Sequence, residues 1–363
     1  MIRKLAALLL LIAAPLGLAA QSRESLRTES GVVVDMAYRS LEPGEPLLFI
    51  LKSPGVSAVI LHFLGKTAVV RTKPVSGRDP MAFLGIDLDV KPGIYPLDMQ
   101  VEKADGSLER IRKEISVTGR TFPFVNLRIS PEFVTPPKSV LVRIQRESEM
   151  VGLVFGSYTP EWLGDGAFMA PHPVRPYPNF GQRRLTNNVA SSVHAGVDLP
   201  VPWGEPIRAV NRGRVVLASS LYLSGGTVII DHGLGVFSYY CHLSKLLVRR
   251  GDAIEKGAVL GKCGSTGRST GPHLHWSMRV GDSRVDPYAL LELPVDGSPD
   301  HGGGQSHSGN STNRIGAPKL AKVGSHGHRP VELQVGIFRP RAGRFWVVEG
   351  TFFVALRIIL RLD

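Results

Sequence analysis

The chain has 363 residues, enough for two or three domains of roughly 100–200 residues each. With 43% hydrophobic and 20% charged residues it has the composition of a folded globular protein, which excludes wholesale disorder. Its 40 glycines and 27 prolines favour turns and short strands over long helices. The formal net charge of +12 indicates a polyanionic neighbour, and two cysteines exclude a disulfide-stapled mini-domain or a Cys-rich zinc finger.

The first 20 residues have the pattern of a secretory signal peptide. Arg3 and Lys4 precede an apolar run, and small residues follow it up to Ala20. An uncleaved membrane anchor is the alternative, but the run is shorter than the ~20 apolar residues that a span needs. We therefore expect residues 1–20 to be removed and the mature protein to be exported to the periplasm or cell envelope, with no stable membrane span. An anionic cell envelope then explains the basic charge better than nucleic acid does, and we predict no nucleic-acid partner.

Residues 28–120 are predicted to form a small β-sandwich. Short β-branched and aromatic runs alternate there with turns such as Pro43-Gly44 and Pro92-Gly93. This region has no cluster of titratable residues, and its His62 is interpreted as a packed strand residue. We expect a structural or spacing role for it.

Residues 121–179 are predicted to be a linker that contains one helix. Apolar side chains recur at helical spacing over residues 138–153, where Val140, Leu141, Ile144 and Val151 form one face and Arg143, Arg146 and Glu147 the opposite one. Four prolines between residues 171 and 178 then indicate a stiff connection.

Residues 180–292 are again rich in predicted strands. Two of them, at residues 226–231 and 235–240, flank His232-Gly233-Leu234 and predict a hairpin. Beyond them, residues 293–363 begin with a Gly-, Ser- and His-rich stretch of low complexity and end in an unassigned tail.

Histidines in residues 180–292 are the most informative side chains of the chain. His273 and His275 are two apart in a predicted strand, so their imidazoles share one face of the sheet. Two such imidazoles can share a metal ion, or one can bind it while the other transfers protons. His242 adds a third imidazole from another predicted strand.

A carboxylate completes a possible ligand set. Asp198 follows His194 by four residues, and Gly196 and Pro200 argue against a helix, so a bent strand or loop would have to bring the two together. Two histidines and one carboxylate are a three-ligand set for Zn²⁺ that leaves the fourth position to water.

Other catalytic patterns fit the sequence poorly. Gly267-Arg268-Ser269-Thr270-Gly271 matches the string of a nucleophile elbow, but that elbow needs a strand before it and a helix after it, whereas Pro272 and a predicted strand follow here. The chain contains no His-Glu-x-x-His motif, so histidine would have to act as the base of a metallopeptidase.

Four segments together resemble the LytM/lysostaphin family of zinc endopeptidases, which cut peptide cross-links of bacterial peptidoglycan. They are Phe180-Gly181-Gln182-Arg183-Arg184, His194-Ala195-Gly196-Val197-Asp198-Leu199, Tyr240-Cys241-His242-Leu243-Ser244, and Gly264-Ser265-Thr266-Gly267-Arg268-Ser269-Thr270-Gly271-Pro272-His273-Leu274-His275-Trp276. The resemblance covers residues 180–292 and implies an antiparallel β-sheet with a groove. The preceding β-rich part is similar, more weakly, to the immunoglobulin-like N-terminal domain of some members.

The resemblance implies a role for each of five residues. His194, Asp198 and His275 would bind Zn²⁺, and His242 and His273 would be the catalytic histidines that assist attack of a zinc-bound water on the scissile amide. Stem peptides of peptidoglycan would be the substrate. An exported protein of this kind fits a D-alanyl–diaminopimelate endopeptidase better than an enzyme that cuts pentaglycine.

Two alternatives stay open at this point. Relatives that lack zinc ligands activate other wall hydrolases, but none of the five positions is lost here. Gly-punctuated segments near residues 210–218 and 249–257 resemble biotinyl/lipoyl-like carriers, yet a lysine at a hairpin tip beside Met or Ala is missing.

Cys241 and Cys263 are consistent with a disulfide or with two buried thiols.

Overall fold

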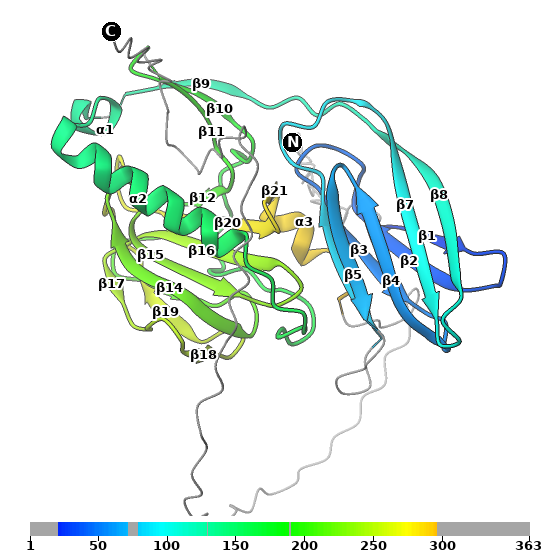
Figure 1. Cartoon of the computed structure of the whole chain (residues 1–363). Helices are drawn as coiled ribbons and strands as arrows, with labels where there is room; N and C mark the ends of the chain where they lie inside the picture. Colours follow the sequence, from blue (N-terminus) through cyan, green and yellow to red (C-terminus); the bar gives the residue numbers. More distant parts are fainter. Residues whose placement is uncertain (1–20, 72–78, 129, 189, 296–363) are drawn as a thin grey trace, which may run out of the picture. The chain divides into compact units, whose positions relative to one another are not determined.

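The computed structural model describes residues 21–71, 79–128, 130–188 and 190–295 of the chain (Figure 1). All of them belong to one compact unit. Strands dominate its secondary structure, with three helices among the described residues, which confirms the mainly β prediction. The predicted signal peptide, and the predicted tail from residue 296 onward, lie outside these residues. Within them, no helix combines the length and apolar composition needed to cross a bilayer.

The N-terminal part is a sandwich of two antiparallel sheets. The first has the order β1 (Ser22–Arg27), β2 (Val33–Tyr38), β3 (Pro46–Leu51) and β6 (Met81–Gly85). The second has the order β5 (Lys66–Arg71), β4 (Val56–Phe63), β7 (Gly93–Lys103) and β8 (Leu108–Val117). Alternate side chains of both sheets, among them Phe49, Leu61 and Val101, fill a common core. The predicted β-sandwich is therefore present, and its immunoglobulin-like character stays a prediction.

Strand β1 begins before residue 28, where the prediction placed the start of this sandwich. It pairs with β2 in register from Ser22 to Arg27, and its Leu26 is buried in the core. Arg23 donates to the Asp35 carboxylate, with Nη2 and Oδ2 2.8 Å apart. The sequence pattern did not predict this strand because its single inward leucine lies among charged and polar residues.

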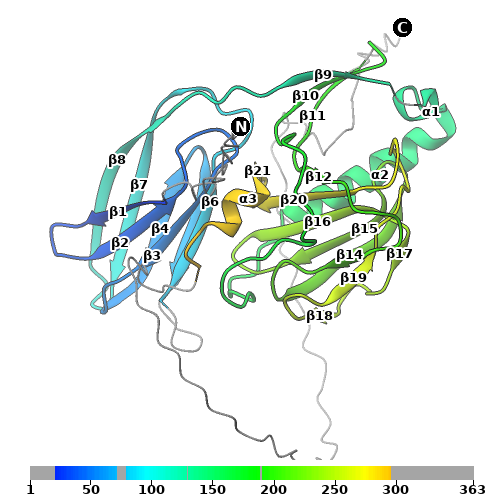
Figure 2. The same ribbon diagram turned by 180° about the vertical axis from the view of Figure 1, so that it is seen from behind.

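The linker contributes two helices and one strand. These are β9 (Phe124–Leu127), α1 (Pro131–Val134) and α2 (Lys138–Phe155). β9 pairs in parallel with β10 (Arg183–Thr186), which forms a hairpin with β11 (Ala190–Val193). The order of this small sheet is therefore β11-β10-β9 (Figure 2).

Helix α2 confirms the predicted helix but shows a different buried face. Ile144, Val151 and Phe155 are its buried side chains, whereas Leu141 is 46% exposed. Glu147 lies on the side of the sheet and accepts a hydrogen bond from the Tyr222 amide at 2.7 Å. The prediction that placed Leu141 on the packed face and Glu147 opposite it was wrong, because periodicity alone does not show where along the helix the sheet makes contact.

The C-terminal part is built around one large antiparallel sheet. Its order is β12 (Val197–Leu199), β20 (Leu274–Val280), β16 (Val236–Leu243), β15 (Gly225–Asp231), β14 (Gly213–Leu221) and β18 (Ala253–Ile254), and β21 (Ser283–Val285) pairs with β20. A smaller sheet consists of β13 (Pro206–Arg208), β19 (Val259–Lys262) and β17 (Lys245–Leu246). α3 (Pro287–Leu291) follows, with Asp286 capping its N-terminus through the Tyr288 amide. The predicted hairpin is present as β15 and β16.

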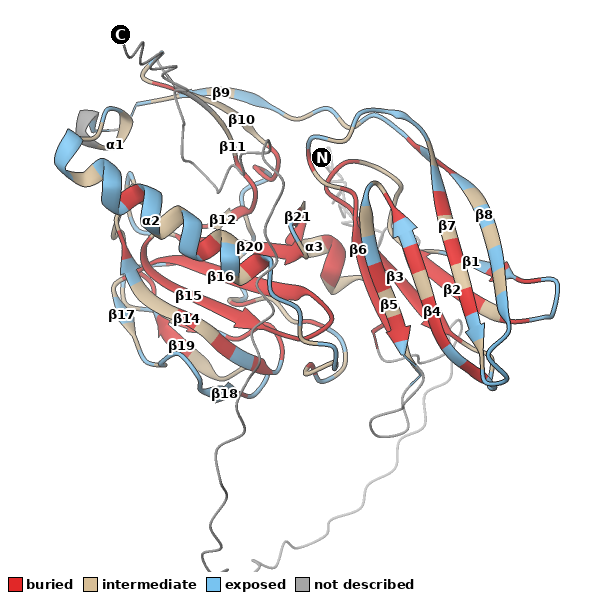
Figure 3. Cartoon of the chain, in the orientation of Figure 1, coloured by how far each residue is buried: buried red, intermediate tan, exposed pale blue. Residues whose placement is uncertain are grey.

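Both faces of the large sheet are covered. On one face, Val151 and Phe155 of α2 pack against Phe237, Tyr239 and other strand residues. On the other face, Tyr240, Trp276 and their neighbours belong to a second core that also includes the small sheet. β15, β16 and β20 are consequently buried along their whole length, as Figure 3 shows.

Ion pairs and packing link the sandwich to the C-terminal sheet. Asp87 accepts from the Arg284 backbone amide at 2.9 Å and from its guanidinium, with Nε 3.0 Å from Oδ2. Arg39 and Arg120, which both donate to the buried Glu45, also donate to the carboxylate of Asp286, at 2.8 Å and 3.0 Å. Phe83 on the outer side of the first sheet stacks near Trp162, with ring centroids 5.4 Å apart. Phe83 and residues of the C-terminal part belong to the same hydrophobic core, which therefore crosses the junction.

Candidate metal centre and active site

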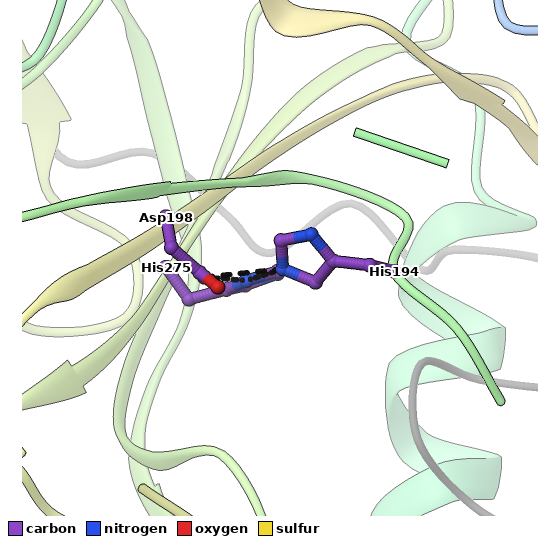
Figure 4. Close-up of side chains that lie close together, drawn as sticks. All are labelled: His194, Asp198 and His275. Atoms are coloured by element: carbon purple, nitrogen blue, oxygen red, sulfur yellow. Dashed lines mark hydrogen bonds and ion pairs between the residues drawn. The ribbon is translucent and has the colours of Figure 1, made fainter. Parts of the chain in front are cut away.

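Two neighbouring strands bring an aspartate and a histidine together. Asp198 of β12 lies opposite His275 of β20, and its Oδ1 is 2.9 Å from the Nδ1 of that histidine. His194, just before β12, places its Nε2 3.1 Å from Asp198 Oδ1 and 2.8 Å from His275 Nδ1 (Figure 4). The three residues predicted as metal ligands thus converge on one point.

Gly196 allows β12 to approach β20 this closely. A Cβ at this position would lie 2.6 Å from the Trp276 carbonyl oxygen, 2.7 Å from Ser277 Cβ and 2.9 Å from His275 Cε1. Any larger residue would have to push the strands apart, and with them the Asp198 and His275 side chains.

Two residues without a predicted role hold the aspartate and His194. Asp198 Oδ2 accepts from Asn179 Nδ2 and from Arg184 Nη2, each at 2.9 Å. The Asn179 carbonyl accepts from Nδ1 of His194 at 2.8 Å, and its side-chain oxygen accepts from the Asp198 amide at 3.1 Å. Arg184 belongs to the first of the four family-like segments and Asn179 directly precedes it, so that segment was the available signal.

The surroundings fix the charge of these groups. Burial would raise the pKa of Asp198, but the adjacent His194 and His275 lower it well below its usual range. Burial lowers the pKa of His194. Because a carbonyl oxygen can only accept, the Nδ1 of His194 carries the proton and its Nε2 lone pair faces Asp198 and His275. An ionised carboxylate and a neutral imidazole are the forms that bind metal ions.

The donor set fits a four-coordinate divalent ion. The three donor atoms lie 2.8–3.1 Å from one another. An ion with ligands at ~2.0–2.1 Å holds tetrahedral donors roughly 3.3 Å apart, so small movements would suffice to bind it. The buried hydrogen bonds to His194 and to the second oxygen of Asp198 orient both ligands, as is usual around metal centres.

A bulge in β16 turns His242 toward this centre. Between the pairs Val228–Tyr240 and Gly226–Leu243, β15 advances two residues while β16 advances three. His242 takes up the extra residue with a φ of 64°, a conformation that costs a residue other than glycine ~1–3 kcal/mol. Its ring lies 4.8 Å from that of His273 and 6.2 Å from that of His275, between centroids. The bulge therefore places a third imidazole beside His273, which directly precedes β20, and His275 of β20.

Backbone carbonyls set the tautomers of His242 and His273. Nδ1 of His242 donates to the Thr266 carbonyl at 2.7 Å, and Nδ1 of His273 donates to the Gly271 carbonyl at 2.8 Å. The Nε2 atom of each ring is then the nitrogen that can accept a proton. Burial, together with His273 and His275, lowers the pKa of His242 to about 3, which keeps this ring neutral near pH 7. Nε2 of His273 is 3.8 Å from Asp198 Oδ1.

All five predicted site residues line one pocket. Its walls come from the β9-β10-β11 sheet, from the loop after β14 and from the loop before β20; beside the five, the lining residues are Leu127, Arg184, Thr186, Ser192, Val193, Leu223, Ser224, Cys241, Arg268, Ser269 and Thr270. The pocket therefore joins the three predicted ligand side chains to the two predicted catalytic histidines.

Other predicted features lie apart from this chemistry. His232 is fully buried between the Arg212 carbonyl at 2.7 Å and Ser238 Oγ at 2.8 Å, and burial lowers its pKa to about 4. His62 was predicted to be packed but is exposed on the surface of the sandwich, where it contacts Thr67 at 2.8 Å. Ser269 lies in a loop with neither the preceding strand nor the following helix of a nucleophile elbow.

Both cysteines are buried thiols that form no disulfide. Cys241 belongs to the core under α2, whereas Cys263 belongs to the core on the other face of the sheet. The sheet itself separates the two thiols, which resolves the alternative that the sequence left open.

A strand-built His/Asp/His cluster beside two further imidazoles defines a site of the metallopeptidase class. Comparison with known proteins agrees: the profile of peptidase family M23 matches residues 192–287. A crystal structure of a protein described as a peptidase M23 from Pseudomonas aeruginosa aligns with a TM-score of 0.52 and 30% identity, over 70% of this chain and 96% of that chain. The chain belongs to peptidase family M23, and this membership implies a metal ion at the site.

Two curated relatives match over a shorter stretch. Peptidoglycan DD-endopeptidase ShyA of Vibrio cholerae is 41% identical over 105 residues, which is 28% of this chain and 24% of that protein. DD-carboxypeptidase/endopeptidase Mpg of Neisseria meningitidis is 39% identical over 103 residues, with the same two coverages. The match therefore spans about a quarter of each of these relatives.

Proposed function

We propose that this chain is an exported, zinc-dependent endopeptidase that hydrolyses the peptide cross-links of bacterial peptidoglycan. One observation carries the proposal: His194, Asp198 and His275 converge within 3.1 Å, beside two imidazoles whose Nδ1 atoms each donate to a backbone carbonyl. The names of ShyA and Mpg, which both describe peptidoglycan endopeptidases, support the substrate.

The two imidazoles and the carboxylate would hold the zinc ion, since a His₂Asp set with an open fourth position is a catalytic zinc site. When bound, the ion supplies Lewis-acid polarisation of a carbonyl oxygen and lowers the pKa of water toward ~7. Arg184 and Asn179 keep the second oxygen of Asp198 occupied, so that its Oδ1 faces the ion.

His242 and His273 would move the protons of the reaction. Their Nε2 atoms would accept a proton from water as its oxygen bonds to the carbonyl carbon, and would give that proton to the amide nitrogen, which leaves as an amine when the C–N bond breaks. The carbonyls of Thr266 and Gly271 hold the rings in this tautomer, and the shared pocket places both beside the ligand cluster.

Residues 1–20 would direct export, which brings the site to its substrate. We expect these residues, fused to a phosphatase that is active only outside the cytoplasm, to yield activity, and a fusion with Arg3 and Lys4 replaced by Glu to yield much less. Equal activity of the two fusions would contradict a signal-peptide role.

The function is tested with purified protein, purified sacculi and mass spectrometry of the released muropeptides. The wild-type chain should bind zinc and release uncross-linked peptides. His273→Ala should keep its zinc and lose cleavage, because this imidazole lies outside the ligand set. Intact sacculi after incubation with the zinc-loaded wild type would contradict the enzyme and favour the activator alternative. Unchanged cleavage by His273→Ala would contradict the role of this histidine.

A further inference from the structure

We propose that Arg268 determines substrate specificity by binding a carboxylate on the amine side of the scissile amide. This inference rests on the proposed function and deepens it. It selects cross-links in which the carbon that bears the leaving nitrogen also bears a carboxylate, as in diaminopimelate.

The charges that line the pocket favour an anionic group. Asp198 is the sole carboxylate among the described lining residues, and Arg184 already donates to its Oδ2 at 2.9 Å. Arg268 is a second arginine on the wall of the same pocket. Since a guanidinium stays protonated at any physiological pH, it adds a permanent positive charge beside the ligand cluster.

The backbone holds Arg268 in a defined place. Its amide donates to the Leu223 carbonyl at 2.7 Å. A Cβ on Gly267, whose φ is +71°, would lie 2.4 Å from the Gly225 nitrogen, and a Cβ on Gly225 would lie 2.2 Å from Thr266 Oγ1. Two glycines thus let the loops after β14 and before β20 pack backbone to backbone. A loop fixed in this way needs no ordering of its backbone when the Arg268 side chain binds a ligand.

The same loop orients both proposed catalytic histidines. The Thr266 carbonyl, two residues before Arg268, holds His242, and the Gly271 carbonyl, three residues after it, holds His273. A carboxylate bound at Arg268 would therefore be anchored to the element that positions the proton-transferring rings. The planar guanidinium can grip a carboxylate with two parallel hydrogen bonds, which fixes direction as well as distance.

This chemistry separates two kinds of cross-link. In a D-alanyl–diaminopimelyl cross-link, a carboxylate is attached to the carbon next to the leaving nitrogen. Within a polyglycine bridge, neither residue at the scissile bond carries one. Arg268 would lower the KM for the D-alanyl–diaminopimelyl cross-link and would not affect the KM for a polyglycine bridge.

The test compares two synthetic cross-linked dimers with the zinc-loaded chain. One dimer has the free diaminopimelate carboxylate beside the scissile amide, and in the other this carboxylate is amidated. The wild type should cleave the free acid with a KM roughly 10- to 100-fold lower, the range expected for hydrogen bonds to a charged group. Equal KM values for the two dimers would overturn the proposal without any variant.

Variants then assign the effect to the side chain. Arg268→Gln should raise the KM for the free-acid dimer to that of the amidated one and leave the amidated dimer unaffected. Arg268→Lys should keep part of the preference for the free-acid dimer, because lysine keeps the positive charge but cannot form two parallel hydrogen bonds with a carboxylate. Arg250→Gln, on an exposed residue outside the pocket, is the control for loss of one positive charge. Thermal unfolding of each variant checks its fold.

The outcomes distinguish this inference from the proposed function. If the zinc-loaded wild type cleaves neither dimer and leaves sacculi intact, the proposed function fails. If it cleaves both dimers with the same KM, or if Arg268→Gln weakens both equally, the endopeptidase stands and the carboxylate site is wrong.

Discussion

The two large sheet regions of this chain use burial differently. β7 and β8 of the sandwich alternate between buried and exposed residues, as expected for a sheet with one face toward solvent. β15, β16 and β20 are buried on both faces (Figure 3). Polar side chains are tolerated in the second setting where they have partners, as His232 has between the Arg212 carbonyl and Ser238.

This difference helps to explain why the candidate active-site residues lie in the C-terminal part. An exposed histidine such as His62 can turn and exchange partners with water. The rings of His194, His242 and His273 are each held by a backbone carbonyl, which fixes both orientation and tautomer. These carbonyls belong to Asn179, Thr266 and Gly271, which lie in loops beside the doubly covered sheet. The loops therefore supply the preorganisation that a metal-dependent hydrolase needs.

Replacing one histidine of each region by alanine should give the largest difference in metal binding and cleavage. His275→Ala removes a ligand atom that lies 2.9 Å from Asp198 Oδ1, so we expect loss of bound metal and a fall of cleavage to background. His62→Ala, on the sandwich surface, should change neither. Metal analysis of the dialysed proteins and digestion of sacculi measure both effects. Full metal occupancy in His275→Ala would contradict its assignment as a ligand.

Two glycines provide the next comparison. Gly196→Ala forces a Cβ to 2.6 Å from the Trp276 carbonyl and should lower metal affinity ~10- to 100-fold through displacement of Asp198. Gly152→Ala in α2 meets no atom within 4 Å and should stabilise the helix by ~0.5–1 kcal/mol without changing affinity. Competition with a chelator measures the affinity. Equal metal affinity of Gly196→Ala and the wild type would show that the strands tolerate the extra atom.

A partly buried and an exposed ion pair should contribute differently to stability as the pH changes. Arg284, aided by backbone amides, outweighs burial and lowers the pKa of Asp87 to about 2 from an ordinary value near 4. The folded state therefore binds fewer protons than the unfolded state between these values, so this contribution is complete above pH ~4 and is lost as the pH falls toward 2. Asp87→Asn should cost about 2 kcal/mol at pH 7 and much less near pH 2.

Urea unfolding at fixed metal concentration measures this difference at each pH. The control is Asp98→Asn, which breaks the exposed pair with Arg112 and should leave the free energy of unfolding nearly unchanged. A cost of Asp87→Asn that stays constant from pH 7 down to pH 2 would contradict the assignment.

The smallest expected effect concerns the strained residue of β16. Both His242→Ala and His242→Gly should abolish cleavage, since each removes the imidazole. Glycine accepts a φ of 64° without strain, so His242→Gly should be more stable to unfolding than His242→Ala by ~1 kcal/mol. The reverse order in a thermal or urea melt would show that the left-handed conformation is not retained in the variants.

Much of the fold and the residues of the site could be predicted from sequence. Alternating and continuous apolar runs indicated the β-sandwich, the β15–β16 hairpin and helix α2, because these patterns are local. The motif resemblance named all five side chains that now line one pocket. It also left His232 out, and that histidine is buried elsewhere.

Long-range pairing established the rest. Asn179 and Arg184 contact Asp198 because β10 and the segment before it lie beside β12. Sequence spacing carries no information on that contact. The amino-acid sequence was enough to predict which side chains form the site, because the histidines, the aspartate and their motifs can be recognised without the fold. Their geometry came only with the packed strands and loops, because one extra residue in β16 places His242 and the register between β12 and β20 places Asp198 opposite His275.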